Sequence, residues 1–238
     1  DAALSYFFTS DSVDDRPDFG LFVLADGMGG HHDGEKASAL TTRTVAHQIL
    51  TQIYLPLLEN SENDADRPTI SEVLSLSVKR ANRDVMRDVP EGGTTLTALV
   101  VVGDLAHIAH VGDSRAYLIS NGSIEQLTRD HSLVQRLIEL NQLTIEESLE
   151  HPQRNVLYRA IGQTQDLEVD TLTRRLPPGS SVLLCSDGLW GLISEKDISA
   201  IVQSTIDPQE ACEKLIALAN AQGGHDNITA ILLRVPQK

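Results

Sequence analysis

The chain has 238 residues, 41% of them hydrophobic, and a formal net charge of −15. This hydrophobic content excludes wholesale disorder, and no apolar stretch approaches the length of a membrane-spanning helix. Nucleic acid is excluded as a partner because an acidic surface without a basic stripe repels a phosphate backbone. The two cysteines, Cys185 and Cys212, form no Cys-x-x-Cys pair, so a disulfide scaffold or zinc site is not expected. Both are interpreted as small buried residues in a reducing compartment.

Short apolar runs rich in branched residues predict buried strands along the whole chain. In chain order, the runs are Phe19–Ala25, Leu96–Val102, Ala106–His110, Ala116–Ile119, Ser181–Cys185 and Ile228–Val235. After the fourth run, Asn121-Gly122 is typical of a two-residue hairpin turn leading into Ile124–Leu127.

Helices are predicted between these strands from their start signals. One is expected from Gly34 to about Leu58. Thr69 stands three residues before Glu72, which is the spacing of a capping box. Asp207 followed by Pro208 supplies an N-cap and a proline at the first helical position. Hairpin-like strands punctuated by helix pairs favour an α+β fold with mostly antiparallel sheets, in one domain over residues 1–238.

Aspartates stand at the ends of several predicted strands. Asp26-Gly27 follows Phe19–Ala25, and Asp187-Gly188 comes shortly after Ser181–Cys185. Asp113 follows a third strand, and Asp226 precedes the last one. A single Asp-Gly pair after a strand usually marks a turn. Four such carboxylates gathered near a low-dielectric core would need cations or protons to neutralise them.

The donor set indicates which cations would fit. Oxygen ligands without Cys, and with few His nearby, favour Mg²⁺, Mn²⁺ or Ca²⁺ over Zn²⁺. Two such ions about 4 Å apart can bridge a water, lower its pKa and clamp a phosphoryl oxygen. The pattern therefore favours hydrolysis of a phosphate ester by direct attack of hydroxide.

Five motifs in this order resemble the metal-dependent (PPM, type 2C) serine/threonine protein phosphatase family. They are Asp26-Gly27-Met28-Gly29-Gly30-His31, Gly93-Thr94-Thr95, Val111-Gly112-Asp113-Ser114-Arg115, Ser186-Asp187-Gly188-Leu189 and Gly224-His225-Asp226-Asn227-Ile228-Thr229. Two further stretches, Thr128–Ser132 and His151–Leu157, look like the bacterial branch of the family. The resemblance spans essentially the whole chain.

The resemblance implies a four-layer α/β/β/α sandwich with two central antiparallel β-sheets flanked by helices. It also implies a small helical flap at about residues 131–160, beside the active site, with helical pieces at Leu133–Leu140 and Ile145–Leu149. An ordinary helical excursion is the alternative interpretation of that segment. The arginine that binds substrate phosphate in relatives would lie upstream of Asp1, so the N-terminal strand and its motif are expected to be missing. Either the chain is a fragment of a longer protein, which is the favoured interpretation, or its substrate binding is weakened.

The resemblance also assigns metal ligands. Asp26 would bridge two Mn²⁺ or Mg²⁺ ions, with the Gly27 carbonyl supporting the second. Asp187 and Asp226 would complete the shell of the first ion, mostly alongside waters. Asp113, together with Asp187, would line a third and weaker site. Asp1 would support the second ion through water.

The catalytic residues expected from this assignment are Asp26, Asp187 and His31. In the loop that follows Asp26, the His31 imidazole could protonate the leaving alkoxide, since its ordinary pKa is near neutral. A solvent-exposed loop histidine next to His32 is the alternative. His131 and His225 are expected to be structural hydrogen-bonding groups.

The predicted function is therefore metal-dependent hydrolysis of phosphoserine and phosphothreonine esters in proteins by a metal-bridged water or hydroxide. The partners expected are phosphorylated proteins and a cognate Ser/Thr kinase, in the cytoplasm or in a cytoplasmic domain of a longer protein. A catalytically weak phosphoprotein-binding or regulatory relative is the alternative, but such a protein would be expected to lack at least one of Asp26, Asp187 and Asp226. A calcium-binding adhesion-like protein is disfavoured because Asp-rich repeats and the twelve-residue calcium loop are missing.

Overall fold

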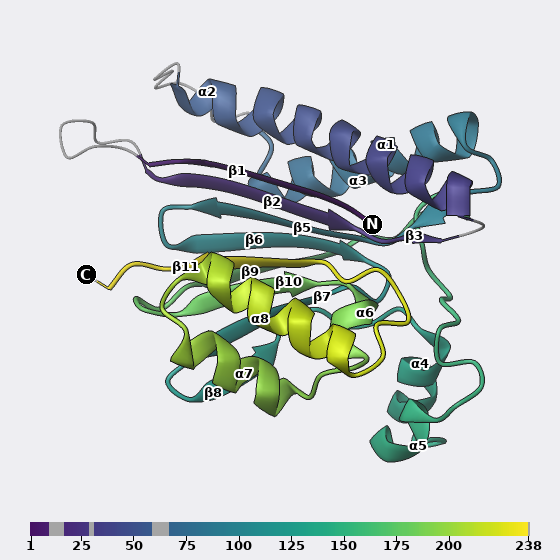
Figure 1. Ribbon diagram of the computed structural model, residues 1–238. Helices are drawn as coiled ribbons and strands as arrows, with labels where there is room; N and C mark the ends of the chain where they lie inside the picture. The colour runs from purple at the N-terminus through teal and green to yellow at the C-terminus, as the bar shows by residue number, and fades with distance from the viewer. Residues whose placement is uncertain (10–16, 29–30, 59–66, 238) are drawn as a thin grey trace.

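The computed structural model describes residues 1–9, 17–28, 31–58 and 67–237, except for the side chains at positions 31 and 32. Two antiparallel sheets lie face to face in the middle of the molecule (Figure 1). The five-stranded sheet has the order β1 (Ala2–Phe8), β2 (Phe19–Ala25), β5 (Leu96–Val102), β6 (Leu105–Val111) and β9 (Asp170–Arg175). The four-stranded sheet has the order β11 (Ala230–Arg234), β10 (Ser181–Cys185), β7 (Arg115–Ser120) and β8 (Ser123–Gln126). A two-stranded ribbon, β3 (Gly27–Met28) with β4 (Gly93–Thr94), leads from β2 toward α1.

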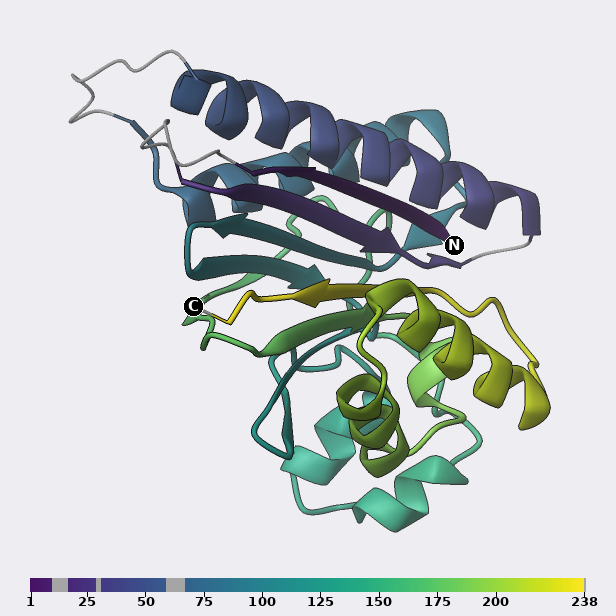
Figure 2. The ribbon, with the colours of Figure 1, turned by 60° about the vertical axis from the view of Figure 1, so that its left-hand side comes forward.

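Helices cover the outer face of each sheet (Figures 1 and 2). On the five-stranded sheet lie α1 (His31–Ile49), which continues through a π-helical turn (Leu50–Tyr54) into α2 (Leu55–Leu58), and α3 (Ile70–Asp88). On the four-stranded sheet lie α7 (Glu195–Ser204), α8 (Pro208–Ala221) and the short α6 (Asp187–Trp190). Two further short helices, α4 (Leu133–Glu139) and α5 (Ile145–Leu149), project beside the four-stranded sheet and its helices. The predicted four-layer α/β/β/α sandwich with a helical flap is confirmed.

Three apolar interfaces hold the four layers together. The first lies between the five-stranded sheet and helices α1 and α3, and includes Val23, Ile49 and Leu74. The second lies between the two sheets and includes Leu24 and Leu184. The third lies between the four-stranded sheet and helices α6 to α8 and is built on residues such as Leu183, Leu189 and Leu215. Since neighbouring residues of a strand point to opposite faces, β2 and β10 each contribute to two interfaces and are buried along their whole length.

Local signals in the sequence account for most of the boundaries. The strands β2, β5 and β10 have the predicted bounds. The capping box at Thr69 is present, with the Glu72 backbone N–H donating to Thr69 Oγ1 at 3.2 Å and the Thr69 N–H donating to Glu72 Oε2 at 2.7 Å. Asp207 caps α8 by accepting from the Gln209 N–H at 2.8 Å.

The structure also contains elements that the sequence did not predict. Strand β1 alternates between half-buried and exposed residues, and β9 is mostly exposed, so neither shows the continuous apolar run of a central strand. Helix α7 was not predicted either, although Ser194 caps it by accepting from the Asp197 N–H at 3.2 Å. Along the part of the chain that is described, no helix has the length and apolar character needed to cross a membrane.

Candidate metal centre

The centre is assembled where strands from both sheets end. Asp26 directly follows β2 of the five-stranded sheet, and Asp113 lies in the turn between β6 and β7. Asp187 opens α6, two residues after β10 of the four-stranded sheet. Asp226 lies between α8 and β11. The two sheets pack face to face, so chain segments 200 residues apart in sequence meet at one end of the sandwich.

The backbone of Asp26 is held by two threonines at the start of β5. The Asp26 N–H donates to Thr95 Oγ1 at 3.0 Å. The Asp26 carbonyl accepts from the Thr95 N–H at 2.8 Å and from the Thr94 hydroxyl at 2.8 Å. The Thr95 hydroxyl also lies 2.8 Å from Ser114 Oγ, which ties this segment to the residue after Asp113. The main chain of Asp26 is therefore fixed, while its carboxylate is left for other partners.

Asp113 is almost completely buried, with 6% of its surface exposed. It follows Gly112, whose φ of 111° belongs to the region that favours glycine. The indole Nε1 of Trp190 donates to the Asp113 carbonyl at 3.0 Å, so the turn is fastened to α6.

Asp187 and the segment around Asp226 are brought together by a close backbone approach. A Cβ on Gly188 would lie only 2.2 Å from the Asn227 carbonyl oxygen, so this position requires glycine. The Ser186 hydroxyl donates to the same carbonyl at 3.3 Å and accepts from the Thr229 N–H at 3.1 Å. Asp226 is exposed, and its Oδ1 accepts from the Asn227 N–H at 2.8 Å.

The pKa values show that these carboxyl groups act on one another. Burial, followed by the charges of Asp187 and Asp113, raises the pKa of Asp26 to about 8. Burial and the charge of Asp187 raise the pKa of Asp113 to about 7. Burial and the charge of Asp226 raise the pKa of Asp187 as well. All four predicted carboxylates therefore share one electrostatic environment, as the sequence motifs imply.

The chemistry of this environment fits divalent cations. Oδ1 of Asp187 is buried and has no hydrogen-bond partner within the described residues. A buried carboxylate oxygen without a partner is costly, and a cation would satisfy it. The donors are hard oxygens, which suit Mg²⁺ or Mn²⁺. Among the described residues, no three Asp, Glu, His or Cys side chains form a ready-made ligand cluster.

The remaining predicted ligands lie on the same side of the molecule. Asp1 accepts from the Thr229 hydroxyl at 2.6 Å through Oδ2, and its amino group donates to Asn227 Oδ1 at 3.3 Å. Asp1 is thus anchored to the segment that carries Asp226. Gly27 pairs with Thr94 in the β3–β4 ribbon and directly follows Asp26. The His31 main chain begins α1, but its side chain lies outside the described residues.

The two histidines expected to be structural, His131 and His225, have different surroundings. His131 is fully buried, and its Nδ1 accepts from the Gly112 N–H at 3.0 Å while its Nε2 lies 3.1 Å from Asp170 Oδ2. Burial lowers its pKa, which keeps the ring neutral and able to accept from Gly112. His131 thus has the structural hydrogen-bonding role expected of it, supporting the turn that carries Asp113. His225 is exposed, and its ring packs near Gly223.

Three residues near the centre were not identified from the sequence. Trp190 is one of them, through its hydrogen bond to Asp113. Gly34 is the second, because a Cβ on Gly27 would lie 2.2 Å from its carbonyl oxygen, so α1 packs directly against the residue after Asp26. Arg154, from the flap, is the third: its charge opposes the rise in the pKa of Asp187 as a lesser effect. The interactions of Trp190 with Asp113 and of Arg154 with Asp187 join segments far apart in the chain, whereas Gly34 lies only seven residues after Gly27. Of the three, only the glycine at position 34 was visible in the sequence as a signal.

Comparisons with known proteins show the family to which the chain belongs. The sequence profile of the family described as protein phosphatase 2C matches residues 9–222. The serine/threonine phosphatase Stp of Listeria monocytogenes is 36% identical over 223 residues, which cover 94% of this chain and 86% of that protein. The protein phosphatase PhpP of Streptococcus pneumoniae is 38% identical over 221 residues, covering 92% of this chain and 87% of that protein.

Solved structures show the same fold. The serine/threonine phosphatase of S. agalactiae superposes with a TM-score of 0.80 at 33% identity, covering 99% of this chain and 93% of that one. The catalytic domain of the phosphatase PstP, solved with two manganese ions, superposes with a TM-score of 0.74 at 31% identity, covering 98% and 97%. None of these similarities supports the alternative of a non-catalytic binding relative. The chain belongs to the protein phosphatase 2C family and is a bacterial-type, Mn²⁺- or Mg²⁺-dependent protein serine/threonine phosphatase.

Proposed function

We propose that Asp26, Asp187 and Asp226 hold the divalent cations, with the Gly27 carbonyl and, through water, Asp1 supporting the second ion. The observation that carries this proposal is the uncompensated carboxylate group: the pKa of Asp26 is raised to about 8 and Asp187 Oδ1 has no partner in the described part of the chain. Bound ions would supply Lewis-acid polarisation of the phosphoryl group and a water of lowered pKa.

The protein's own residues contribute position and protons. Thr94 and Thr95 fix the Asp26 main chain, so that its carboxylate is presented in one orientation before any ligand arrives. The close approach of Gly188 to Asn227 holds the Asp187 and Asp226 segments together in the same way. The pKa values of Asp26 and Asp187 are both raised by burial and by neighbouring carboxylates, so an arriving cation would favour loss of protons from this group.

We further assign Asp113, with Asp187, to a third and weaker cation site. Its buried carboxyl group, with a pKa raised to about 7, supports this assignment. Because a neutral carboxylic acid is a poor ligand, occupation of such a site should increase as the pH rises above 7.

His31 is proposed as the acid that protonates the leaving alkoxide. A test follows from leaving-group chemistry, because p-nitrophenolate leaves without a proton and a serine alkoxide does not. His31→Gln should lower the hydrolysis rate of a phosphoserine peptide and leave that of p-nitrophenyl phosphate almost unchanged. His32→Gln is the matched control. Equal effects on both substrates would remove His31 from this role.

The wider assignments are proposals as well. Residues 1–238 would act as one PPM-type catalytic domain, with residues 131–160 as a flap that influences substrate choice. A cognate Ser/Thr kinase is the expected partner, since reversible phosphorylation requires one. A cytoplasmic location is supported by the two free, buried cysteines.

The experiment that tests the function is hydrolysis of a phosphoserine peptide and of p-nitrophenyl phosphate with added Mn²⁺ or Mg²⁺. Activity should require the cation and disappear on chelation. Activity that survives complete removal of divalent cations would contradict the proposed role of the carboxylates.

A further inference from the structure

The backbone of Asp113 is held by the side chain of Trp190, which lies on α6 three residues after Asp187. The indole Nε1 of Trp190 donates to the Asp113 carbonyl at 3.0 Å. Asp187 opens α6, and the Gly191 N–H closes the turn by donating to the Asp187 carbonyl at 2.8 Å. A single helical turn therefore carries the Asp187 carboxylate at its start and the contact with Asp113 at its end.

This turn is packed closely at both ends. A Cβ on Gly191 would lie 2.8 Å from the Asp187 carbonyl oxygen. A Cβ on Gly188 would lie 2.2 Å from the Asn227 carbonyl oxygen. Because contacts this short leave no room for another side chain, the turn has little freedom to change shape. The Trp190 indole and the Asp187 carboxylate are thus held at a fixed spacing.

The ring of Trp190 is itself held by a buried ion pair. The guanidinium carbon of Arg115 lies 3.6 Å from the ring centroid, where the face of an aromatic ring attracts a cation. Arg115 donates to Asp130 Oδ2 at 2.7 Å and to the Tyr117 hydroxyl at 2.9 Å. Asp130 and Tyr117 are both buried, so the guanidinium has little room to move. The indole N–H is therefore kept aimed at the Asp113 carbonyl.

The contact matters because Asp113 and Asp187 act on one another. After burial, the charge of Asp187 is the largest cause of the raised pKa of Asp113, so the two carboxyl groups lie close together. The next residue, Ser114, leads elsewhere, since its Oγ lies 2.8 Å from Thr95 Oγ1 at the start of β5. Among the described residues, Trp190 supplies the one hydrogen bond that joins the Asp113 turn to α6.

We propose that Trp190 is the positioning residue of the third and weaker cation site, because its N–H sets the spacing between Asp113 and Asp187. This inference rests on the proposed function, which assigns that site to these two carboxylates. A group that orients a metal ligand without touching the ion commonly changes the affinity by about 10- to 100-fold. Loss of the indole N–H should weaken the third ion and spare the other two, since the approach of Gly188 to Asn227 still holds Asp187.

The test counts bound Mn²⁺. The protein is freed of metal and titrated with Mn²⁺ alone, and the free ion is measured by its electron paramagnetic resonance signal. The wild type should bind two ions tightly and a third more weakly. Trp190→Phe keeps an aromatic ring beside Arg115 but removes the donor, so it should weaken the third ion about tenfold and leave the other two unchanged. Asp113→Asn should abolish binding of the third ion.

The matched control is Tyr117→Phe. It also removes one buried hydrogen bond of an aromatic side chain, but the Tyr117 hydroxyl pairs with Arg115 and not with Asp113. This variant should bind all three ions as the wild type does. A second variant tests the case in which Trp190→Phe fails to fold. Benzothienylalanine at position 190 has nearly the shape of tryptophan with sulfur in place of the N–H, and it should weaken the third ion to the same extent.

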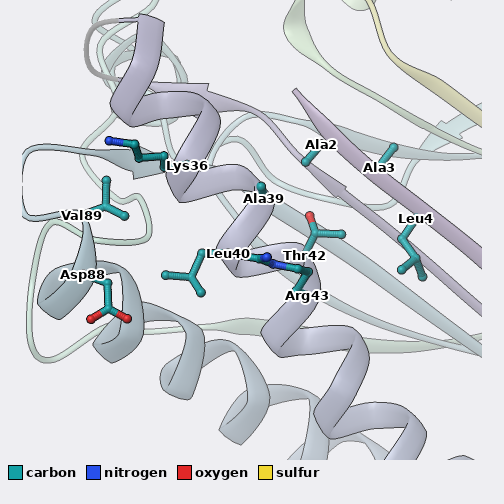
Figure 3. A pocket seen from close by; sticks show the side chains of 10 residues that line it. All are labelled: Ala2, Ala3, Leu4, Lys36, Ala39, Leu40, Thr42, Arg43, Asp88 and Val89. Carbon is teal, nitrogen blue, oxygen red and sulfur yellow. The ribbon is translucent and has the colours of Figure 1, made fainter.

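General attraction of Mn²⁺ to an acidic surface needs its own control, since the chain has a net charge of −15. Asp88 ends α3 and lines a groove of about 580 Å³ beside α1, and no residue of the candidate metal centre other than those on its backbone path lines that groove (Figure 3). Asp88→Asn should leave all three ions in place. If it weakened the third ion as strongly as Asp113→Asn, the weak binding would be non-specific and the inference would be overturned.

The remaining outcomes separate this inference from the function on which it rests. If Trp190→Phe and the benzothienylalanine variant bound the third ion as tightly as the wild type, the role of Trp190 would be refuted and the proposed function would stand. Equal weakening by Trp190→Phe and Tyr117→Phe would also refute it. A wild type that bound only two ions would remove the third site together with this inference. A wild type that bound none would contradict the proposed function itself.

Discussion

Two groups of buried carboxylates at neighbouring places in the molecule are neutralised in opposite ways. Asp130 is 3% exposed and is held by Arg115, whose Nη2 lies 2.7 Å from Asp130 Oδ2 and whose Nε contacts both carboxylate oxygens at 3.1 Å. Asp113 is 6% exposed, two residues before Arg115, and has no such partner in the described part. The pKa of Asp113 is raised to about 7. The protein supplies its own cation to Asp130 and, within the described residues, none to Asp113, which supports the cation site proposed there.

Carboxylates next to the flap are also paired with cationic side chains of the protein itself. Arg159 donates to Asp170 at 2.7 Å and to Glu168 at 2.8 Å, and His131 lies 3.1 Å from Asp170. Although burial would raise it, the pKa of Asp170 is lowered by its hydrogen bonds to His131 and Arg159. Burial alone therefore does not mark the metal centre. The candidate metal centre is distinguished by buried carboxylates that have no ion-pair partner, since carboxylates in structural ion pairs are already neutralised.

The largest effect is expected from a substitution among the carboxylates that lack an ion-pair partner. Asp187→Asn keeps the shape of the side chain but removes its charge, so cation binding and the hydrolysis rate should fall by orders of magnitude while the fold survives. The rate on p-nitrophenyl phosphate with Mn²⁺ and the circular dichroism spectrum measure the two quantities.

The matched control is Asp166→Asn, at an exposed carboxylate on the loop before β9. It should have wild-type activity. If Asp187→Asn and Asp166→Asn were equally active, the distinction between the two kinds of carboxylate would have no catalytic meaning.

The second prediction concerns the buried ion pair between Arg115 and Asp130. Asp130→Ala leaves the Arg115 guanidinium partly buried without its counter-ion, which should lower the free energy of unfolding by about 3 kcal/mol. Arg115 also packs on the Trp190 ring at 3.6 Å, so it cannot turn freely to solvent. Urea unfolding measures the effect, and the double variant Arg115→Met/Asp130→Ala should recover part of the loss. A single variant as stable as the wild type would contradict the structural role of this pair.

The third prediction concerns the pH dependence of the stability of the metal-free protein. A carboxyl group with a raised pKa holds its proton in the folded state at pH values where the unfolded chain has lost it. For Asp26, with an ordinary value of 3.8 and a folded value of about 8, the metal-free protein should lose stability as the pH rises through this window. Melting temperatures in EDTA should fall from pH 5 to pH 8, and saturating Mg²⁺ should flatten the curve. Asp26→Asn should flatten it without Mg²⁺, whereas a metal-free melting temperature that rises with pH would oppose the account.

The smallest effect is expected at an exposed pair. Arg174 Nη2 lies 2.6 Å from Glu125 Oε2, but both side chains are about half exposed, so solvent screens the interaction. Glu125→Gln should change the free energy of unfolding by less than about 1 kcal/mol. Urea unfolding beside Asp130→Ala provides the comparison, and equal losses would mean that burial does not set the strength of these pairs.

The sequence predicted those parts of the fold that local rules determine. The uninterrupted apolar runs of β2, β5 and β10 and the capping box at Thr69 have the predicted positions because each depends on neighbouring residues. Strand β1 was missed because it is an edge strand whose alternation is carried by Ala, Ser and aromatic residues rather than by branched ones.

The sequence named the residues of the candidate site but did not indicate how the surrounding segments pack. Aspartates next to strand ends were visible, and the resemblance to a family indicated that they meet. The contacts that bring them together, such as Gly188 against Asn227 and Trp190 against Asp113, join residues 39 and 77 positions apart. Such contacts depend on how the layers pack, and no local pattern encodes them.

The most direct test of the central claim is a crystal structure of the protein grown with Mn²⁺, with the ions located by their anomalous scattering. The account predicts at least two ions at the end of the sandwich, with carboxylate oxygens of Asp26, Asp187 and Asp226 among their ligands. A structure in which this end holds only protonated carboxyl groups and water, or in which the ions bind at Asp130 or Asp170 instead, would contradict it.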